Sequence, residues 1–333
     1  MPILLDIYFF TVSFGYITGS QGPTGPPGGN GCSLPPYAFV FNGSTVNVID
    51  PISHEVTASI AMPFTVTSMG SDPVTRRLYL LSASGTLAVL DGDSNAIVSE
   101  IILPPGNYAQ SGVAVNPNNH QVYIASPSNP FVVAVNGYND TVAAQIPVQS
   151  TGSVVVNSRT NLTYVSSPTG LEGINSNSNQ LVLKIPFSPG ELKNLIAYSC
   201  KNLILSSDGS RLVVIDGKRN TIENAARAQD GIWAMALDGS LGLLFVINET
   251  GNAVNVYDAC SLEFRGGLML NAGSAPTFSN ISVDARNHLV YVSDTKGQGI
   301  YIADGGLNQS IAAIADTGAG EGIVTLACDG KCC

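Results

Sequence analysis

The chain has 333 residues, of which 44% are apolar and 11% charged, and its 24 acidic and 14 basic residues give a net charge of −10. It has no clustered lysines or arginines of the kind that neutralise phosphates, so composition argues against a nucleic-acid partner. Turn-forming residues are plentiful, at 35 glycines and 19 prolines, and only the short stretch 220–228 has a helical look. These features favour an all-β protein.

Residues 1–18 form an apolar N-terminal arm with the alternation of a strand. One interpretation is a secretory signal peptide, but the arm lacks a basic start and an A-x-A cleavage site. We favour the other interpretation, an extended strand that docks on a second copy of the chain. The arm is too short and too interrupted for a transmembrane helix. The predicted assembly residues are Ile7, Phe10, Val12, Phe14 and Tyr16.

Residues 19–31 repeat glycine at every third position. Only glycine fits the crowded axis of a collagen triple helix, so this period indicates a collagen-like segment. A flexible Gly/Pro linker is the alternative. The segment resembles the short collagen-like segments of bacterial surface and spore-surface proteins. Its glycines are Gly19, Gly22, Gly25, Gly28 and Gly31.

The remainder, residues 32–333, is organised by a short apolar strand that recurs seven times. Each period of about forty residues contains four β-rich runs separated by turn residues, and a fixed period of this length is typical of a repeat architecture. The strand begins at residues 45, 86, 131, 171, 211, 253 and 300, where the sequence reads TVNVID, TLAVLD, FVVAVN, LEGINS, RLVVID, AVNVYD and IYIADG.

This repeat resembles the YVTN-type β-propeller family, whose unit pairs a TVxVID strand with a later VAVxPDG…YVxN pair. The segments that carry the resemblance are TVNVID, RLVVID, SGVAVNPNNHQVYIAS and ISVDARNHLVYVSD, and the resemblance covers about residues 37–328. It implies one closed seven-bladed β-propeller rather than two domains.

The two ends of the repeat region predict how the ring closes. The last period supplies only three strands, while residues 37–42, YAFVFN, precede the first repeat. We therefore expect residues 37–42 to pair with the strand around 323–328 as the outer strand of the last blade. This arrangement would remove an unpaired sheet edge.

Six cysteines are candidates for disulfide bonds. Closure of the ring would bring Cys32 near the C-terminal cluster, and a bond there would indicate an oxidising compartment. We predict Cys332 or Cys333 as its partner. Cys200 and Cys260 fall in different blades and are expected to be buried thiols or to bond between subunits. The candidates are Cys32, Cys200, Cys260, Cys328, Cys332 and Cys333.

We predict no catalytic, metal-binding or cofactor-binding residue. The three histidines, His54, His120 and His288, fall in turns that should face away from the central mouth, where propeller ligands usually enter. The series Asp91, Asp93 and Asn95 suggests a calcium loop but is explained by turn geometry, since the central glycine and closing glutamate are missing. Trp233 is expected near the mouth, in a packing role.

Six N-x-S/T sequons are possible glycosylation sites, and they matter only in an exported chain. They begin at Asn42, Asn139, Asn161, Asn248, Asn280 and Asn308.

The resulting hypothesis is a non-enzymatic extracellular protein of a cell or spore surface. Its propeller would be a structural or adhesive head, displayed or polymerised into a filament through the N-terminal arm and the collagen-like segment. Self-association through the arm is the expected partnership. The alternatives are a propeller enzyme of the lactonase or quinoprotein kind and a soluble secreted ligand-binding propeller, which the fold by itself does not separate from the first hypothesis.

Overall fold

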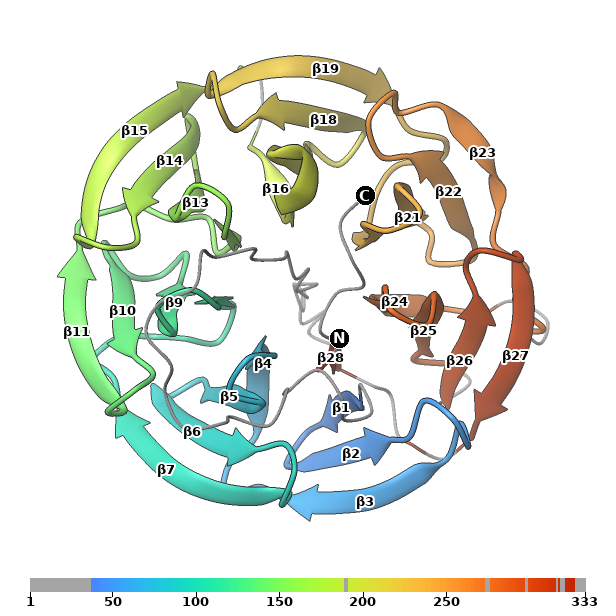
Figure 1. Cartoon of the computed structure of the whole chain (residues 1–333), viewed down its shortest axis with the longest axis horizontal. Helices are drawn as coiled ribbons and strands as arrows, with labels where there is room; N and C mark the ends of the chain where they lie inside the picture. Colours follow the sequence, from blue (N-terminus) through green and yellow to red (C-terminus); the bar gives the residue numbers. More distant parts are fainter. Residues whose placement is uncertain are drawn as a thin grey trace, which may run out of the picture.

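The computed structural model describes residues 37–188, 191–272, 276–296, 299–315, 317 and 321–326. In this part of the chain, 28 strands form seven four-stranded antiparallel sheets, the blades of a β-propeller arranged around a central axis (Figure 1). The predicted all-β, seven-bladed fold is confirmed. The arm predicted for residues 1–18 and the collagen-like segment predicted for residues 19–31 lie outside the described residues.

We number the blades I to VII in chain order, starting with the blade that contains β1. The innermost strands contact one another in sequence around a closed ring and are almost entirely buried. From blade I to blade VII they are β28 (Gly322–Thr325), β4 (Val66–Asp72), β8 (Gly112–Asn116), β12 (Val154–Asn157), β16 (Lys193–Tyr198), β20 (Ala234–Asp238) and β24 (Phe278–Asp284).

The second strand of each blade continues the sheet outward. These strands are β1 (Ala38–Asn42), β5 (Arg77–Ser82), β9 (Gln121–Ala125), β13 (Leu162–Ser167), β17 (Leu203–Ser207), β21 (Leu243–Ile247) and β25 (Leu289–Asp294).

The repeated motif that begins with TVNVID forms the third strand of every blade. The expectation that residues 37–42 end the last blade makes this motif the first strand of each blade, and that assignment is wrong by two strands. A fixed period reveals the size of the repeat but not the point at which one blade ends. The third strands are β2 (Thr45–Ile49), β6 (Thr86–Asp91), β10 (Val132–Asn136), β14 (Gly170–Asn175), β18 (Arg211–Asp216), β22 (Val254–Asp258) and β26 (Gly299–Asp304).

The outer strands are half-exposed and alternate between inward and outward side chains. The stretch 220–228, which has a helical look in the sequence, belongs to this set as β19, because pairing with β18 overrides local propensity. The outer strands are β3 (Val56–Ala61), β7 (Ala96–Ile102), β11 (Thr141–Ile146), β15 (Gln180–Pro186), β19 (Thr221–Arg227), β23 (Phe264–Gly267) and β27 (Gln309–Ile314).

Among the described residues the only helical segment is the 3₁₀ turn η2 (Ser199–Lys201). No helix in that part of the chain has the length and apolarity needed to cross a bilayer.

Blade I is built from both ends of the repeat region. The predicted pairing between the first and last strands is confirmed, since Phe39 of β1 pairs with Val324 of β28. The predicted place of residues 37–42, as the outer strand of the last blade, is wrong. The sheet order is β28-β1-β2-β3, so β1 is the second strand and pairs with the first repeat motif as well. The incoming strand is therefore the C-terminal β28, which fills the innermost position.

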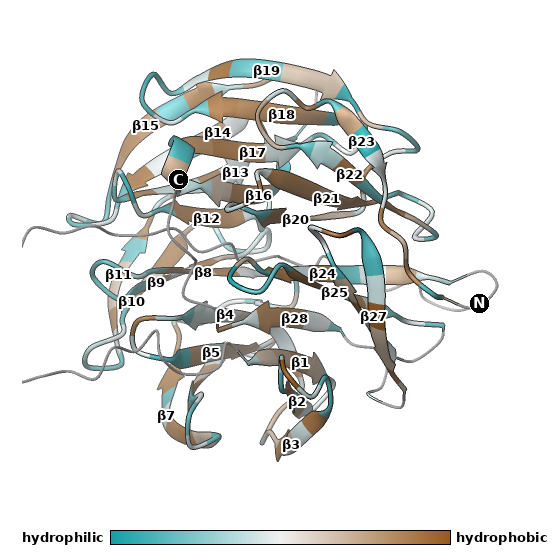
Figure 2. Cartoon of the chain, turned by 45° about the vertical axis from the view of Figure 1, so that its right-hand side comes forward, coloured by the Kyte–Doolittle hydropathy of each residue, from teal (hydrophilic) through white to brown (hydrophobic). Residues whose placement is uncertain are grey.

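The apolar core is divided among the seven blade interfaces. Each interface holds one cluster of buried side chains contributed by two adjacent sheets. Figure 2 shows the apolar colours concentrated in the strands and the hydrophilic colours in several of the connecting turns. Burial of these interfaces is the main term that stabilises the ring.

The turns within a blade are tied together by a repeated backbone bond. A residue with positive φ ends the turn after six of the innermost strands, and its carbonyl accepts an N–H from the turn between the third and outer strands. In blade III the Gly137 N–H donates to the His120 carbonyl at 2.8 Å. A Cβ at Gly137 would lie 2.5 Å from that oxygen, so the contact requires glycine.

Candidate functional site

The connections of an antiparallel blade divide between two faces of the ring. The turn face contains the turns from first to second strand and from third to outer strand. The mouth face contains the loops from second to third strand and from each outer strand to the next innermost strand. Its described residues are 43–44, 62–65, 83–85, 103–111, 126–131, 147–153, 168–169, 187–188, 191–192, 208–210, 228–233, 248–253, 268–272, 276–277, 295–296, 315, 317 and 321.

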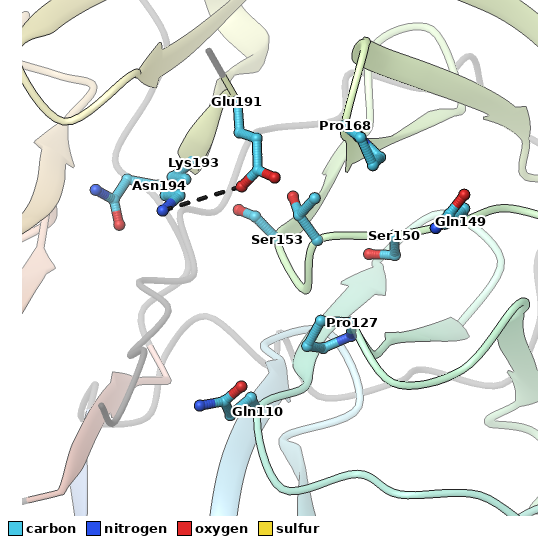
Figure 3. A pocket seen from close by; sticks show the side chains of 10 residues that line it. Gln110, Pro127, Gln149, Ser150, Ser153, Pro168, Glu191, Lys193 and Asn194 are labelled. Carbon is cyan, nitrogen blue, oxygen red and sulfur yellow. Dashed lines mark ion pairs between the residues drawn. The ribbon is translucent and has the colours of Figure 1, made fainter. Parts of the chain in front are cut away.

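A pocket of about 350 Å³ opens on the mouth face (Figure 3). Gln110, Ser153 and Lys193 lie in it at or beside the first residues of β8, β12 and β16. The pocket therefore sits beside the central axis, on the side of blades III to V. We call it the mouth pocket.

The lining of the mouth pocket is mostly neutral and polar. Amides come from Gln110, Gln149 and Asn194, and hydroxyls come from Ser150, Thr151 and Ser153. The rings of Pro127 and Pro168 supply apolar surface, and the loops that carry these prolines belong to blades III and IV.

One ion pair lies at the edge of this lining. Lys193 Nζ is 4.0 Å from Glu191 Oε2, and both side chains are partly exposed (Figure 3). At this distance and exposure the pair has little energetic weight, so the pocket offers an incoming group mainly neutral hydrogen-bonding partners.

Two of the serine hydroxyls that line the pocket accept hydrogen bonds from the backbone. Ser150 Oγ accepts the Gly152 N–H at 2.8 Å, and Ser153 Oγ accepts the Leu195 N–H at 3.1 Å. Both serines are buried, with 3% exposure. Because a hydroxyl donates one hydrogen bond and accepts two, each oxygen still has a proton to direct at a ligand.

Trp233 lies beside the mouth pocket and is held from both sides. The amide of Asn194, in the pocket wall, donates to the Trp233 carbonyl at 3.3 Å. The Trp233 indole N–H donates to the Ser279 carbonyl of blade VII at 3.0 Å. The indole thus reaches from blade VI towards blade VII, its N–H is satisfied, and 40% of the residue is exposed on the mouth face.

The histidines lie on the turn face, as predicted. Two of them join neighbouring blades: His120 Nδ1 is 2.5 Å from Asp72 Oδ2, and His288 Nδ1 is 2.8 Å from Asp238 Oδ2. Each aspartate ends an innermost strand and is almost fully buried. These histidines serve blade packing and do not converge with the mouth pocket.

His54 lies apart from the other two histidines. It lines a second cavity of about 460 Å³ between β3 and the end of β27, where blades I and VII meet. It has positive φ, like the residues at the same position in the other blades.

The Asp91, Asp93 and Asn95 series forms a turn, as the sequence indicates. The Asp91 carboxylate accepts the backbone N–H groups of Asp93 and Ser94, at 3.1 and 2.7 Å. The bond from Ser94 is the main reason that the pKa of Asp91 lies below its ordinary value. No group of three or more His, Cys, Asp or Glu side chains that could hold a metal occurs among the described residues.

Two of the six cysteines lie in the described part of the chain. Cys260 is an exposed thiol on the turn face of blade VI, which differs from the burial expected for it and leaves a bond between subunits as a prediction. Cys200 lies in η2 and is disulfide-bonded, so the buried thiol expected for it is wrong. The remaining candidates, Cys32, Cys328, Cys332 and Cys333, are outside the described residues, so the Cys32 bond stays a prediction.

The sequon asparagines differ in accessibility. Asn139 and Asn308 are exposed, and Asn42 and Asn161 are half-exposed. Asn248 and Asn280 are buried and donate hydrogen bonds to Asn252 and to the Glu321 carbonyl. These two side chains are inaccessible to a glycan in the folded protein.

The mouth pocket was not anticipated from the sequence. Its residues are ordinary loop amides and hydroxyls that match no catalytic or metal motif. The one feature of the sequence that sets these loops apart is that residues 103–111, 126–131 and 147–153 contain no charged side chain. The lack of charge indicates a shared neutral surface only once the fold has brought the three loops together.

No family model matches the chain. Over 134 residues it is 27% identical to the uncharacterized protein YncE of Salmonella typhi, and the match covers 38% of this chain and 37% of YncE. YncE of Salmonella typhimurium matches to the same extent. The match thus spans well under half of these curated relatives.

Solved structures with the same architecture are more distant in sequence. AztD of Citrobacter koseri superimposes with a TM-score of 0.68 and 12% identity, over 90% of this chain and 100% of AztD. Hydrazine synthase of Kuenenia stuttgartiensis gives 0.64 and 12%, over 77% and 88%. The dihydro-heme d1 dehydrogenase NirN in complex with DHE gives 0.62 and 13%, over 92% and 77%. At these identities the likeness establishes the β-propeller fold alone.

Proposed function

We propose that this chain is a non-enzymatic extracellular binding protein of a cell or spore surface. The propeller is the displayed head, and the mouth pocket recognises a ligand outside the cell. Residues 1–31 attach the head to a surface layer or to sister subunits, in the way that their strand-like and collagen-like patterns suggest.

The observation that carries the proposal is the chemistry of the mouth pocket. Three amides and three hydroxyls surround a preformed cavity beside the axis, and they belong to strand β16 and to loops held in place by the neighbouring strands. Such a lining suits reversible recognition through hydrogen bonds.

The positions of the histidines support binding over catalysis. His120 and His288 are held by Asp72 and Asp238 on the turn face, remote from the pocket. General acid–base chemistry needs a titrating group within hydrogen-bond reach of the reacting atoms. In the mouth pocket the ionisable side chains are Glu191 and Lys193, which pair with each other.

Surface labelling tests the proposed location. Intact producing cells and spores are stained with an antibody against residues 37–326, with permeabilised cells as the reference. We expect staining of intact cells, and loss of cell-bound protein when residues 1–31 are deleted. Staining confined to permeabilised cells would overturn the proposal.

The role of residues 1–31 in self-association is tested on the purified protein. Light scattering and negative-stain microscopy compare the full chain with the variant that lacks them. The full chain should form oligomers or filaments and the shortened chain should be a monomer. An unchanged assembly state would remove these residues from the proposed attachment.

A further inference from the structure

The mouth face is divided into a neutral part and a charged part. The loops of blades I to IV on this face contain no aspartate, glutamate, lysine, arginine or histidine, although the whole chain carries 38 residues of the first four types. Charged residues appear only from Glu191 onward, in the loops that lead into and belong to blades V to VII and in the loop that leads into blade I, where Glu321 accepts the Gly43 N–H. The mouth pocket is built mostly from the neutral part.

This distribution selects against charged ligands. A phosphate, carboxylate or sulfate group entering the pocket would meet Lys193 together with the Glu191 carboxylate 4.0 Å away, and the two charges sum to zero. An ammonium group would likewise meet the Glu191 carboxylate together with the positive charge of Lys193. Specificity for a charged ligand requires an unpaired counter-charge, and the neutral loops supply none.

The pocket instead matches a ligand with several neutral hydroxyls. Buried Ser150 and Ser153 each use one lone pair on a backbone N–H and keep a proton to donate. The Gln149 amide adds both a donor and an acceptor at the rim. A sugar hydroxyl is also both donor and acceptor, so neighbouring hydroxyls of one ring can be satisfied by such a mixed set.

Trp233 supplies the remaining element of sugar recognition, an apolar surface for the C–H face of a pyranose ring. Its indole is oriented by the bond to Ser279 of blade VII, and the bond from Asn194 joins the main-chain carbonyl of Trp233 to the pocket wall. A chain of two or more sugar rings could therefore fill the pocket with one ring and stack a neighbouring ring on Trp233.

From this arrangement we infer that the mouth pocket and Trp233 together bind an uncharged oligosaccharide. The inference rests on the proposed function and names the ligand class of its binding site.

A glycan array probed with the full-length protein tests the ligand class. The array carries neutral oligosaccharides beside sialylated, sulfated and uronate-containing ones. We expect binding to a subset of the neutral glycans, and a loss of at least tenfold in apparent affinity for Trp233→Ala and for Gln149→Ala. Trp233→Tyr, which keeps an aromatic face, should recover part of the binding.

Two matched variants show whether any loss is specific to the site. Tyr138→Ala removes an exposed aromatic side chain from the turn face, and Gln180→Ala removes an exposed glutamine from outer strand β15. Both should bind within twofold of the unchanged protein, with all variants retaining its β-sheet circular dichroism. Equal losses in the control variants would overturn the assignment of the site.

Binding only to acidic glycans, or to no glycan, would overturn the ligand class. The surface labelling described above would still decide the proposed location and display on its own, so failure of the ligand class and failure of the proposed function are distinguishable.

Discussion

Phe39 of β1 lies directly opposite Val324 of β28, in the antiparallel pair that closes the ring. Both side chains are buried, and both belong to the cluster that packs blade I against blade II. This one strand pair thus completes a sheet and a blade interface together.

The substitution Val324→Ala tests how much the pairing of β1 with β28 contributes to the free energy of unfolding. Removing two buried methyl groups should lower the free energy of unfolding by about 2 kcal/mol, measured by urea denaturation. Val98→Ala, at a half-exposed position on outer strand β7, is the matched control and should change it by less than about 0.5 kcal/mol. Equal effects at the two positions would show that β28 is not part of the cooperative core.

His120 is predicted to be a structural residue that joins blades II and III. His120→Asn keeps a residue that tolerates positive φ but removes the imidazole from the buried Asp72 carboxylate. We expect a loss of about 1–3 kcal/mol in the free energy of unfolding, because a buried acceptor loses its partner.

His54→Asn provides the comparison for that variant. His54 also has positive φ but lies on a cavity rim. The substitution His54→Asn should therefore change the free energy of unfolding by less than about 0.5 kcal/mol. If His120→Asn also left the free energy of unfolding unchanged, the contact with Asp72 would not contribute to stability.

Asp284 is predicted to make stability depend on pH. This carboxyl ends β24 and is fully buried, and burial raises its pKa above the ordinary value of 3.8. The native state then binds the proton more tightly than the unfolded state. Its contribution to stability is complete below pH 3.8 and is lost as the pH rises through the raised native pKa.

Asp284→Asn removes this titration while keeping one acceptor for the Arg286 N–H. Denaturation between pH 3 and pH 8 should show that the variant gains stability over the unchanged protein as the pH rises. A difference that is constant over this range would contradict the raised pKa.

Much of the architecture could be predicted from the sequence, because the period near forty residues and the turn residues within it repeat in every blade. The strand at which each blade begins could not be predicted. TVNVID reads equally well as a first or a third strand, since both are short, apolar and followed by an Asx turn. The faces of the turns were nevertheless correct, because a shift of two strands in an antiparallel sheet restores the same face.

The mouth pocket was beyond prediction for a different reason. Gln110, Ser150 and Asn194 are separated by about forty residues each, and nothing local marks any of them as a binding residue. Their juxtaposition depends on three consecutive innermost strands starting at the same height in the ring. Trp233 could be placed near the mouth from the sequence, but its exposed indole and its bond to blade VII could not.

Trp233 is the only tryptophan in the chain, so its fluorescence reports directly on occupation of the mouth. The most direct measurement is a titration of the full-length protein with the neutral oligosaccharides that bind it on the array. We predict a saturable change in Trp233 emission whose midpoint moves to an at least tenfold higher ligand concentration in Gln149→Ala and stays within twofold in Gln180→Ala. Binding that leaves the emission unchanged, or a midpoint that does not move in Gln149→Ala, would contradict recognition at the mouth pocket.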